Sequence, residues 1–265
     1  MPRLVVDHAS RFPAHWNRHL QGTGALEESD GTVRFLNVDT TSLQYSNAQI
    51  DDYQGLHRGR LPWRPPLTLA VRARFSAPEG SLTGTAGFGF WNDPFLMTEW
   101  RVPTLPRAVW FFYASPRSDI KLARNVPGHG WKAATVDALR PVSLMLALLA
   151  IPAVLAMNLS PLYRLLWPPI QNALRIREAP LDVAMTDWHS YVMEWGVERS
   201  CFFVDDRPVI ENAPSPLGPL GFVMWLDNQY MVVKPWGRFD WGLLEAPGPQ
   251  WLEVDRLAIE TPSAA

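Results

Sequence analysis

The stretch 187–211 constrains the fold of this chain more than any other. Within it, large residues at every second position predict a β-strand with one buried face: His189, Tyr191, Met193 and Trp195. A turn, a second apolar run at 202–204, a polar turn and a third apolar run follow. Three short strands joined by tight turns form an antiparallel meander, so we expect an all-β protein with Trp195 and Phe203 in its core.

Seven other segments carry the alternation or the β-branched and aromatic residues of strands: 32–38, 67–75, 84–91, 107–114, 220–227, 231–234 and 250–260. Both faces of 107–114 are apolar, with Trp110 and Phe112 on one side and Phe111 and Tyr113 on the other, which predicts a central strand. Glycines alternate with aromatics in 84–91, which predicts close approach of another backbone or a ligand. A chain of 265 residues, 47% of them apolar, is long enough for one large domain over 1–265.

Several classes of function are disfavoured by charge and motif content. A formal net charge of −2 argues against a general nucleic-acid binder, and one cysteine excludes a disulfide framework. The N-terminal residues lack the apolar run of a secretory signal, so a cytoplasmic location is expected. The histidine spacing matches no metal site, and no cofactor motif is present. Asn47, Asp51 and Asp52 indicate either a solvated turn or a structural calcium site.

Five blocks follow one another along the chain: Leu-Thr-Leu-Ala-Val-Arg-Ala-Arg-Phe, Gly-Phe-Gly-Phe-Trp, Trp-His-Ser-Tyr-Val-Met-Glu-Trp, Phe-Phe-Val-Asp-Asp-Arg-Pro-Val and Trp-Leu-Glu-Val-Asp-Arg-Leu-Ala-Ile. Their order resembles that of the concanavalin A-like lectin/glucanase sandwiches, most closely the family-16 glycoside hydrolases. The resemblance covers 67–259 with one interruption. It implies a jelly roll of two stacked antiparallel sheets with a cleft on the concave face.

The resemblance also implies where catalytic residues belong. Those hydrolases carry Glu-x-Asp-x-(x)-Glu on the strand after the Phe-Trp block, with nucleophile and acid/base about 5 Å apart. Here that strand reads Leu-Pro-Arg-Ala-Val-Trp-Phe-Phe-Tyr and holds no carboxylate. Candidate relocated catalytic residues are Asp93, Glu99 and Asp227. Candidate ligand-binding residues of an aromatic cleft are Trp91, Asn92, Trp110, Phe112, Tyr113, His189, Trp225, Asn228, Tyr230 and Trp236.

The interruption, 140–178, is the second informative feature. Its first part has no charged residue between Pro141 and Tyr163, and its second part is amphipathic. Because sandwich blocks flank it, both ends must emerge on the same side, which predicts a helical hairpin and excludes a single membrane crossing. The expected membrane contacts are Leu144, Leu148, Ile151, Leu155, Leu166 and Trp167. The alternative is that the hairpin packs on the sandwich or in a dimer interface.

Two functional classes remain open at this point. One is a protein bound peripherally to the inner, anionic membrane surface, whose aromatic cleft holds a lipid, isoprenoid or glycolipid, either as a bound ligand or as a substrate. The other is a glycoside hydrolase or lectin with relocated acidic residues. The missing carboxylates on 107–114 favour the first class, and the sequence leaves open whether the chain is an enzyme.

Overall fold

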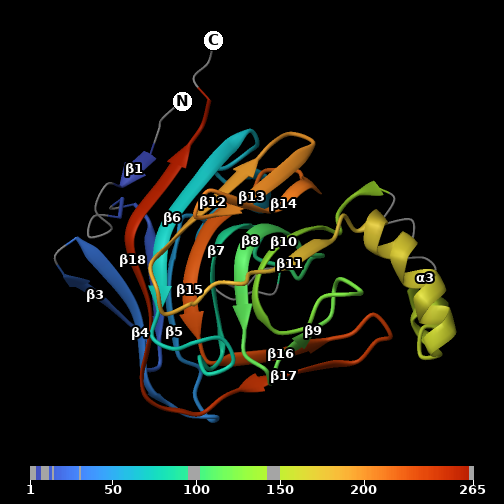
Figure 1. Ribbon diagram of the computed structural model, residues 1–265, viewed down its shortest axis with the longest axis horizontal. Helices are drawn as coiled ribbons and strands as arrows, with labels where there is room; N and C mark the ends of the chain where they lie inside the picture. The colour runs from blue at the N-terminus through green and yellow to red at the C-terminus, as the bar shows by residue number, and fades with distance from the viewer. Residues whose placement is uncertain are drawn as a thin grey trace.

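The computed structural model describes residues 4–6, 12–13, 15–29, 31–94, 102–141 and 150–262. Two large antiparallel sheets lie face to face (Figure 1). Sheet A has the order β14-β13-β12-β6-β18-β4-β3, with β1 paired to β18, and sheet B has the order β11-β10-β8-β7-β15-β5-β2. A small third sheet, β17-β16-β9, lies beside them. This is the all-β jelly-roll sandwich that the sequence predicts, with helices inserted between β10 and β11.

The strand bounds are as follows. Sheet A contains β1 (Leu4–Val6), β3 (Ala25–Ser29), β4 (Thr32–Thr40), β6 (Leu67–Phe75), β12 (His189–Trp195), β13 (Arg199–Val204), β14 (Arg207–Pro214) and β18 (Ala246–Glu260). Sheet B contains β2 (Asn17–Gln21), β5 (Asn47–Asp51), β7 (Thr85–Trp91), β8 (Arg107–Ala114), β10 (Gly130–Asp137), β11 (Arg177–Pro180) and β15 (Gly221–Asp227). The third sheet contains β9 (Asp119–Ile120), β16 (Gln229–Val233) and β17 (Phe239–Leu243). A short 3₁₀ helix, η1, spans Arg58–Arg60.

The main core lies between the two sheets and is built from alternate residues of each strand. Tyr191 of β12 and Phe111 of β8 face each other across it, with ring centroids 5.3 Å apart, and Trp131 of β10 lies 5.5 Å from Tyr191. Such edge-to-face pairs add to the stabilisation from apolar burial. Strand β8 lies between β7 and β10, as the apolar character of both its faces predicts.

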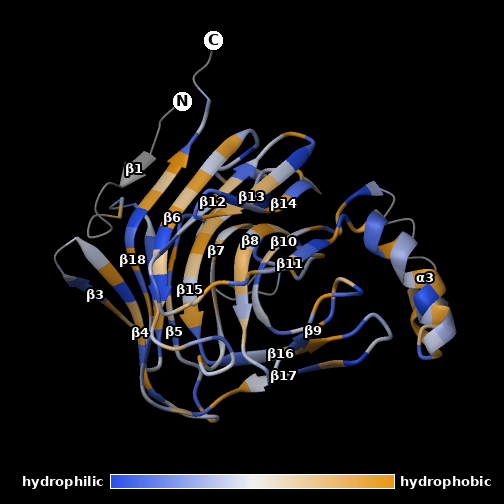
Figure 2. Cartoon of the chain, in the orientation of Figure 1, coloured by the Kyte–Doolittle hydropathy of each residue, from blue (hydrophilic) through white to orange (hydrophobic). Residues whose placement is uncertain are grey.

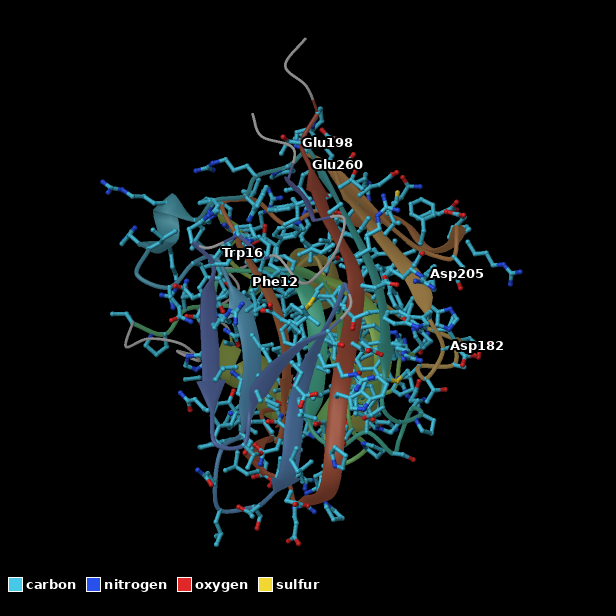
Figure 3. All side chains as sticks on the ribbon, turned by 90° about the vertical axis from the view of Figure 1, so that its left-hand side faces the viewer. Phe12, Trp16, Asp182, Glu198, Asp205 and Glu260 are labelled. Carbon is cyan, nitrogen blue, oxygen red and sulfur yellow. The ribbon has the colours of Figure 1, made fainter. Side chains whose placement is uncertain are left out.

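The segment before β2 closes one side of this core. Phe12 and Trp16, labelled in Figure 3, stack with centroids 5.9 Å apart. Phe12 contacts Phe35 of sheet A, and Trp16 contacts Phe222 of sheet B at 4.9 Å. The two rings therefore bridge the sheets where the sandwich would otherwise be open to water.

Three expectations need correction. The predicted turn or calcium site around Asn47 and Asp51 is instead the buried strand β5. Phe203 is half-buried, and its neighbour Phe202 fills the core position, because Phe202 pairs with Met193 on the core face of β12 whereas Phe203 pairs with the outward Val192. The third difference is that strand β10 lies outside the predicted strand segments, as do β2, β3, β11 and β17.

The insertion contains α2 (Ala150–Ala156) and α3 (Ser160–Ala173), which form the predicted helical hairpin within the described part of 140–178. Proline near the first turn of α3 suits a helix start, because the first amides have no partner inside the helix. Figure 2 shows apolar and polar residues along α3, which stands at the side of the sandwich. Among the described residues, no helix has the length and apolar character needed to cross a bilayer.

Candidate functional site

The candidate site is the outer face of sheet B, the face turned away from sheet A. Residues facing the core alternate with outward ones along each strand, so Ala108, Trp110 and Phe112 of β8 lie on the opposite side from Val109, Phe111 and Tyr113. The outward aromatics join a second hydrophobic cluster that also contains Met157 and Trp167 of the insertion. The hairpin thus packs against the same side of sheet B on which the candidate site lies.

Four aromatic rings form the apolar half of this face. Trp110 and Phe112 stack at 5.3 Å with planes 19° apart. Trp225 of β15 lies 5.7 Å from Trp110 and 6.0 Å from Phe112, while Trp91 of β7 lies 5.8 Å from Trp110. Trp110 and Phe112 are partly exposed, whereas Trp91 and Trp225 are buried. Trp110 and Phe112 are therefore the rings available for stacking on a ligand.

Two glycines in β7 make room for these rings. A Cβ at Gly87 would lie 2.3 Å from the carbonyl oxygen of Phe111 and 2.9 Å from the indole of Trp225. A Cβ at Gly89 would lie 2.6 Å from Cβ of Trp110. The bare glycine face that the sequence predicts is present, and side chains of the neighbouring strands occupy it.

Hydrogen bonds fix the orientation of Trp225. Its Nε1 donates to Oγ1 of Thr85 at 2.9 Å, and the Thr85 hydroxyl donates to Oδ1 of Asp227 at 2.8 Å. The backbone amides of Thr85 and Gln229 donate to the same carboxylate oxygen at 3.2 and 3.0 Å. Burial raises the pKa of Asp227 to about 6, although these hydrogen bonds oppose the rise.

A polar strip on β2 and β5 forms the other half of the face. Asp51 is fully buried and accepts hydrogen bonds from side-chain amides of Asn17 (3.1 Å), Gln49 (2.9 Å) and Gln54 (2.6 Å). The backbone amides of Tyr53 and Gln54 also donate to it. With five donors around two oxygens, this carboxylate orients the amides of the strip and is saturated as an acceptor.

His19 is the titratable group at the more exposed edge of the polar strip. Its Nε2 lies 3.1 Å from the side-chain amide nitrogen of Gln21. Burial lowers the pKa of His19, with the negative charges of Asp51 and Asp93 acting in the opposite direction. A neutral imidazole and the exposed Gln21 amide offer both donors and acceptors to a ligand hydroxyl.

The candidate catalytic carboxylates do not come together. Asp227 pairs with Thr85 at one end of β7, whereas Asp93 follows Trp91 beyond the other end. At about 3.4 Å per residue, these ends are roughly 20 Å apart, well beyond the 5 to 10 Å that separates paired carboxylates in glycosidases. Asp93 is fully buried, and Glu99 lies outside the described residues.

Asp51 does not complete a pair with Asp227 either. It lies across from Val223, four positions along β15 from Asp227, which is about 14 Å of strand. Within the described part of the chain, no group of three histidine, cysteine or acidic side chains is placed to hold a metal ion. The arrangement on sheet B therefore suits binding through stacking and hydrogen bonds better than acid/base hydrolysis.

Several predicted ligand-binding residues have structural contacts instead. Asn92 and Asn228 are buried, and their side chains bond to backbone groups that hold loops in place. Tyr113 points into the core, where its hydroxyl donates to the carbonyl of Leu82. His189 belongs to sheet A and pairs with Asp205 at 2.6 Å. Four predicted residues, namely Trp91, Trp110, Phe112 and Trp225, share the candidate site.

The remaining candidates lie around the third sheet and the hairpin. Tyr230 donates its hydroxyl to Asp240 and lies under the guanidinium of Arg117. Trp236 contacts Tyr163 of α3 edge to face at 5.2 Å. Trp167 is buried and donates its indole N–H to the carbonyl of Leu122, so its predicted exposure to lipid headgroups is wrong.

The other predicted membrane contacts differ in exposure. Ile151 and Leu155 are exposed, and Leu166 is half-buried against the second cluster. Leu144 and Leu148 lie outside the described residues. Only part of the predicted apolar surface therefore faces solvent in the described region.

Comparison with known proteins identifies the fold. No family model matches the sequence, and no curated protein matches it either. Similar solved structures include a β-1,3-1,4-glucanase (lichenase) from a mouse hindgut metagenome, with a TM-score of 0.52, 13% identity, and coverage of 98% of this chain and 99% of that one. The β-glucanase of Bacillus licheniformis (TM-score 0.51, 9% identity) covers 99% of both chains. The Crh5 transglycosylase in complex with NAG (TM-score 0.52, 12% identity) aligns over 99% of this chain and 85% of that one.

These similarities confirm the concanavalin A-like sandwich expected from the ordered blocks. At 9 to 13% identity, these similarities establish the fold alone. The function therefore has to be inferred from the residues of the candidate site.

Proposed function

We propose that this protein binds carbohydrate without hydrolysing it, and that the ligand lies on the outer face of sheet B. The observation that carries the proposal is that two half-exposed stacked rings, Trp110 and Phe112 of β8, share the outer face of sheet B with the exposed Gln21 amide and the His19 imidazole of β2, with β7, β15 and β5 between them. An aromatic surface with a few converging polar groups is the usual composition of a small-ligand site. The similarity to structures of glucanases and a transglycosylase supports a carbohydrate as the ligand.

The absence of hydrolysis follows from the outward positions of β8. Ala108, Trp110 and Phe112 occupy the strand on which the resemblance to family 16 places the catalytic carboxylates. An apolar group cannot donate a proton to a leaving oxygen or attack an anomeric carbon. The buried carboxylates Asp51 and Asp227 are held by several donors each and lie too far apart to act as a pair.

A hydrophobic or glycolipid ligand is the second candidate. The four rings and apolar side chains of the hairpin belong to one hydrophobic cluster, which extends from Trp225 to Trp167. This shared apolar surface favours a ligand with an apolar part. A glycolipid could place its sugar against Trp110 and its apolar part toward the hairpin side. This candidate predicts that lipid-linked glycans bind more tightly than the free sugars.

Binding to soluble β-glucans and to a glycan array tests the proposal. We expect measurable binding by the intact protein and a loss of about tenfold or more for Trp110→Ala, equivalent to roughly 1.4 kcal/mol. Trp241→Ala, which removes an exposed indole from β17, is the matched control and should leave affinity unchanged. Absence of binding to every glycan tested, or equal affinities for the intact protein and Trp110→Ala, would contradict it.

A further inference from the structure

The helical hairpin exposes apolar side chains on the side that does not pack against the sandwich. Ile151, Leu155 and Leu159 follow one another at intervals of four residues and are 77%, 67% and 62% exposed. Leu165 of α3 is 68% exposed. Positions four apart lie on one side of a helix, so Ile151 and Leu155 form a single stripe on α2. We call these four side chains the hairpin face.

Specific contacts hold the hairpin in this orientation. The side chain of Asn158 donates to the carbonyl of Trp236 at 3.3 Å, and Tyr163 packs edge to face on the indole of that residue. Val154 fits against Gly237, where a Cβ would lie 2.6 Å from its methyl group. Since Trp167 is also buried and hydrogen-bonded, the hairpin already has an apolar side that is packed. The hairpin face is therefore a second apolar side, which burial within the described fold does not explain.

The charges around this face identify the kind of surface it fits. The sequence 138–177 contains no aspartate or glutamate and four arginines: Arg140, which forms an ion pair with the neighbouring Asp137 at 2.8 Å, and Arg164, Arg175 and Arg177. Arg164 is exposed and directly precedes Leu165 on α3. Apolar side chains flanked by arginines complement an anionic lipid surface, which offers hydrocarbon below a layer of phosphates.

A second copy of the chain is less complementary to the hairpin face. In a two-fold symmetric pair the same patch meets itself, so Arg164 of each copy would approach the other. The segment 138–177 supplies no carboxylate to offset that repulsion. Net attraction between two such faces would have to come from the aliphatic contacts alone.

We infer that the hairpin face is a docking surface for an anionic lipid bilayer. Helix α3 has 14 residues and so is about 21 Å long, less than the roughly 30 Å of hydrocarbon in a bilayer. The hairpin therefore lies in the interfacial layer, with Ile151, Leu155 and Leu165 inserted and Arg164 near the phosphates. The sandwich remains in water. This inference is independent of the glycan proposal, because it uses a different surface.

Vesicle flotation with the full chain tests the inference. The probes are vesicles of phosphatidylcholine alone and of an equal mixture of phosphatidylcholine and phosphatidylglycerol. The test variant carries Ile151→Asn, Leu155→Gln and Leu165→Gln. The matched control carries Leu43→Gln, Val102→Gln and Val197→Gln, three aliphatics at exposed positions elsewhere, 93%, 80% and 61% accessible. Arg164→Gln is compared with Arg207→Gln, an exposed arginine on β14.

We expect the intact protein and both controls to float with the mixed vesicles. The triple variant should lose at least about tenfold in partitioning, since each inserted aliphatic contributes to transfer from water. Arg164→Gln should weaken flotation less and reduce its salt dependence. Failure of the intact protein to float, or equal flotation of the triple variant and its control, overturns the inference. So does a dimer in solution that the triple variant dissociates while vesicles have no effect on either protein.

Discussion

The indole N–H of Trp225 on β15 donates to the hydroxyl of Thr85 on β7, with 2.9 Å between the two heavy atoms. The same hydroxyl donates to Asp227 at 2.8 Å, so a neighbouring strand connects the aromatic ring to a buried carboxylate. A hydroxyl can accept one hydrogen bond while it donates another, which is why threonine suits this position. The orientation of Trp225 in the candidate site thus depends on a residue that contacts no ligand in the proposed binding mode.

Replacement of Thr85 by valine tests this connection. Thr85→Val keeps the shape of the side chain but leaves the buried indole N–H without its acceptor and removes a donor from Asp227. We expect the free energy of unfolding to fall by about 1 to 3 kcal/mol, measured by urea denaturation. Thr68→Val, at a half-exposed position on β6, is the control and should cost less. Equal losses in the two variants would show that the Thr85 hydroxyl does not fix the ring.

Trp195 and Phe203 distinguish the two sides of the β12–β13 pair. Trp195 is fully buried and donates its indole N–H to the carbonyl of Pro216 at 3.0 Å, whereas Phe203 is half-buried on the outer side of sheet A. Trp195→Ala should lower the free energy of unfolding by about 3 to 5 kcal/mol because it leaves a cavity. Phe203→Ala should lower it by about 1 kcal/mol, since less apolar area leaves contact. A larger loss for Phe203→Ala would show that the faces are reversed.

The alternation of large residues is what made most of the strands predictable. Segments such as Leu67–Phe75 and His189–Trp195 have a core face whose residues stand out from their neighbours, so both the bounds and the orientation of these strands could be predicted. Strand β5, Asn-Ala-Gln-Ile-Asp, also alternates, but its outward side is polar and its inward side has only Ala48 and Ile50. Its polar residues are typical of a solvated turn, and only the pairing of β5 with β2 and β15 explains why they are buried.

The candidate site was predictable in its aromatic half only. Trp110 and Phe112 stand where the resemblance expects carboxylates, which directs attention to that face. The polar strip depends on the pairing of β2 with β5. Strand β2 has no strong sequence pattern, and the sequence of β5 predicts a turn, so this pairing could not be predicted. The surroundings of Trp167 could not be predicted for a different reason. A tryptophan on an amphipathic helix can face lipid or protein, and only tertiary packing against Leu122 distinguishes the two.

Hydrolysis assays test directly whether the protein lacks glycosidase activity, as the outward residues of β8 predict. We expect no release of reducing sugar from laminarin or lichenan, because the outward positions of β8 carry Ala108, Trp110 and Phe112. The assay is run on the intact protein beside Asp51→Asn and Asp93→Asn. Robust turnover by the intact protein that disappears in either variant would demonstrate a relocated catalytic carboxylate.

Asp52 predicts a pH dependence of stability. Burial raises the pKa of Asp52 from 3.8 to about 7, against the opposing hydrogen bonds from Trp63 and from the backbone amide of Phe222. The folded protein therefore binds this proton more tightly than the unfolded chain. The stabilisation is fully present below about pH 4 and is lost as the pH rises through 7.

The measurement compares urea denaturation of the intact protein and of Asp52→Asn from pH 5 to pH 8. The free energy of unfolding of the intact protein should fall relative to the variant by about 1.4 kcal/mol per pH unit at most. Asp227, whose pKa burial also raises, titrates in both proteins and cancels in the difference. Parallel pH profiles would show that Asp52 is ionised throughout this range.

Lys132 of β10 and Glu178 of β11 form an ion pair that is almost completely buried under the loop between β9 and β10. Their side chains are 1% and 3% exposed, and Nζ lies 3.1 Å from Oε1. Lys132 also donates to the carbonyl of Pro127, and Glu178 accepts from the amide of Ala123 at 2.8 Å. The pair thus anchors the loop that carries Leu122, whose carbonyl binds Trp167 of the hairpin.

Removal of one partner should cost more than removal of both charges. Lys132→Met leaves a buried carboxylate without its counter-charge, so we expect the free energy of unfolding to fall by about 3 to 5 kcal/mol. Glu178→Gln added to Lys132→Met removes that charge and keeps an oxygen for the Ala123 amide, so the double variant should recover most of the loss. Urea denaturation of Lys132→Met, of Glu178→Gln alone and of the double variant completes the double-mutant cycle. If the losses of the single variants simply add in the double variant, the two charges do not compensate each other, and another contact holds the loop to sheet B.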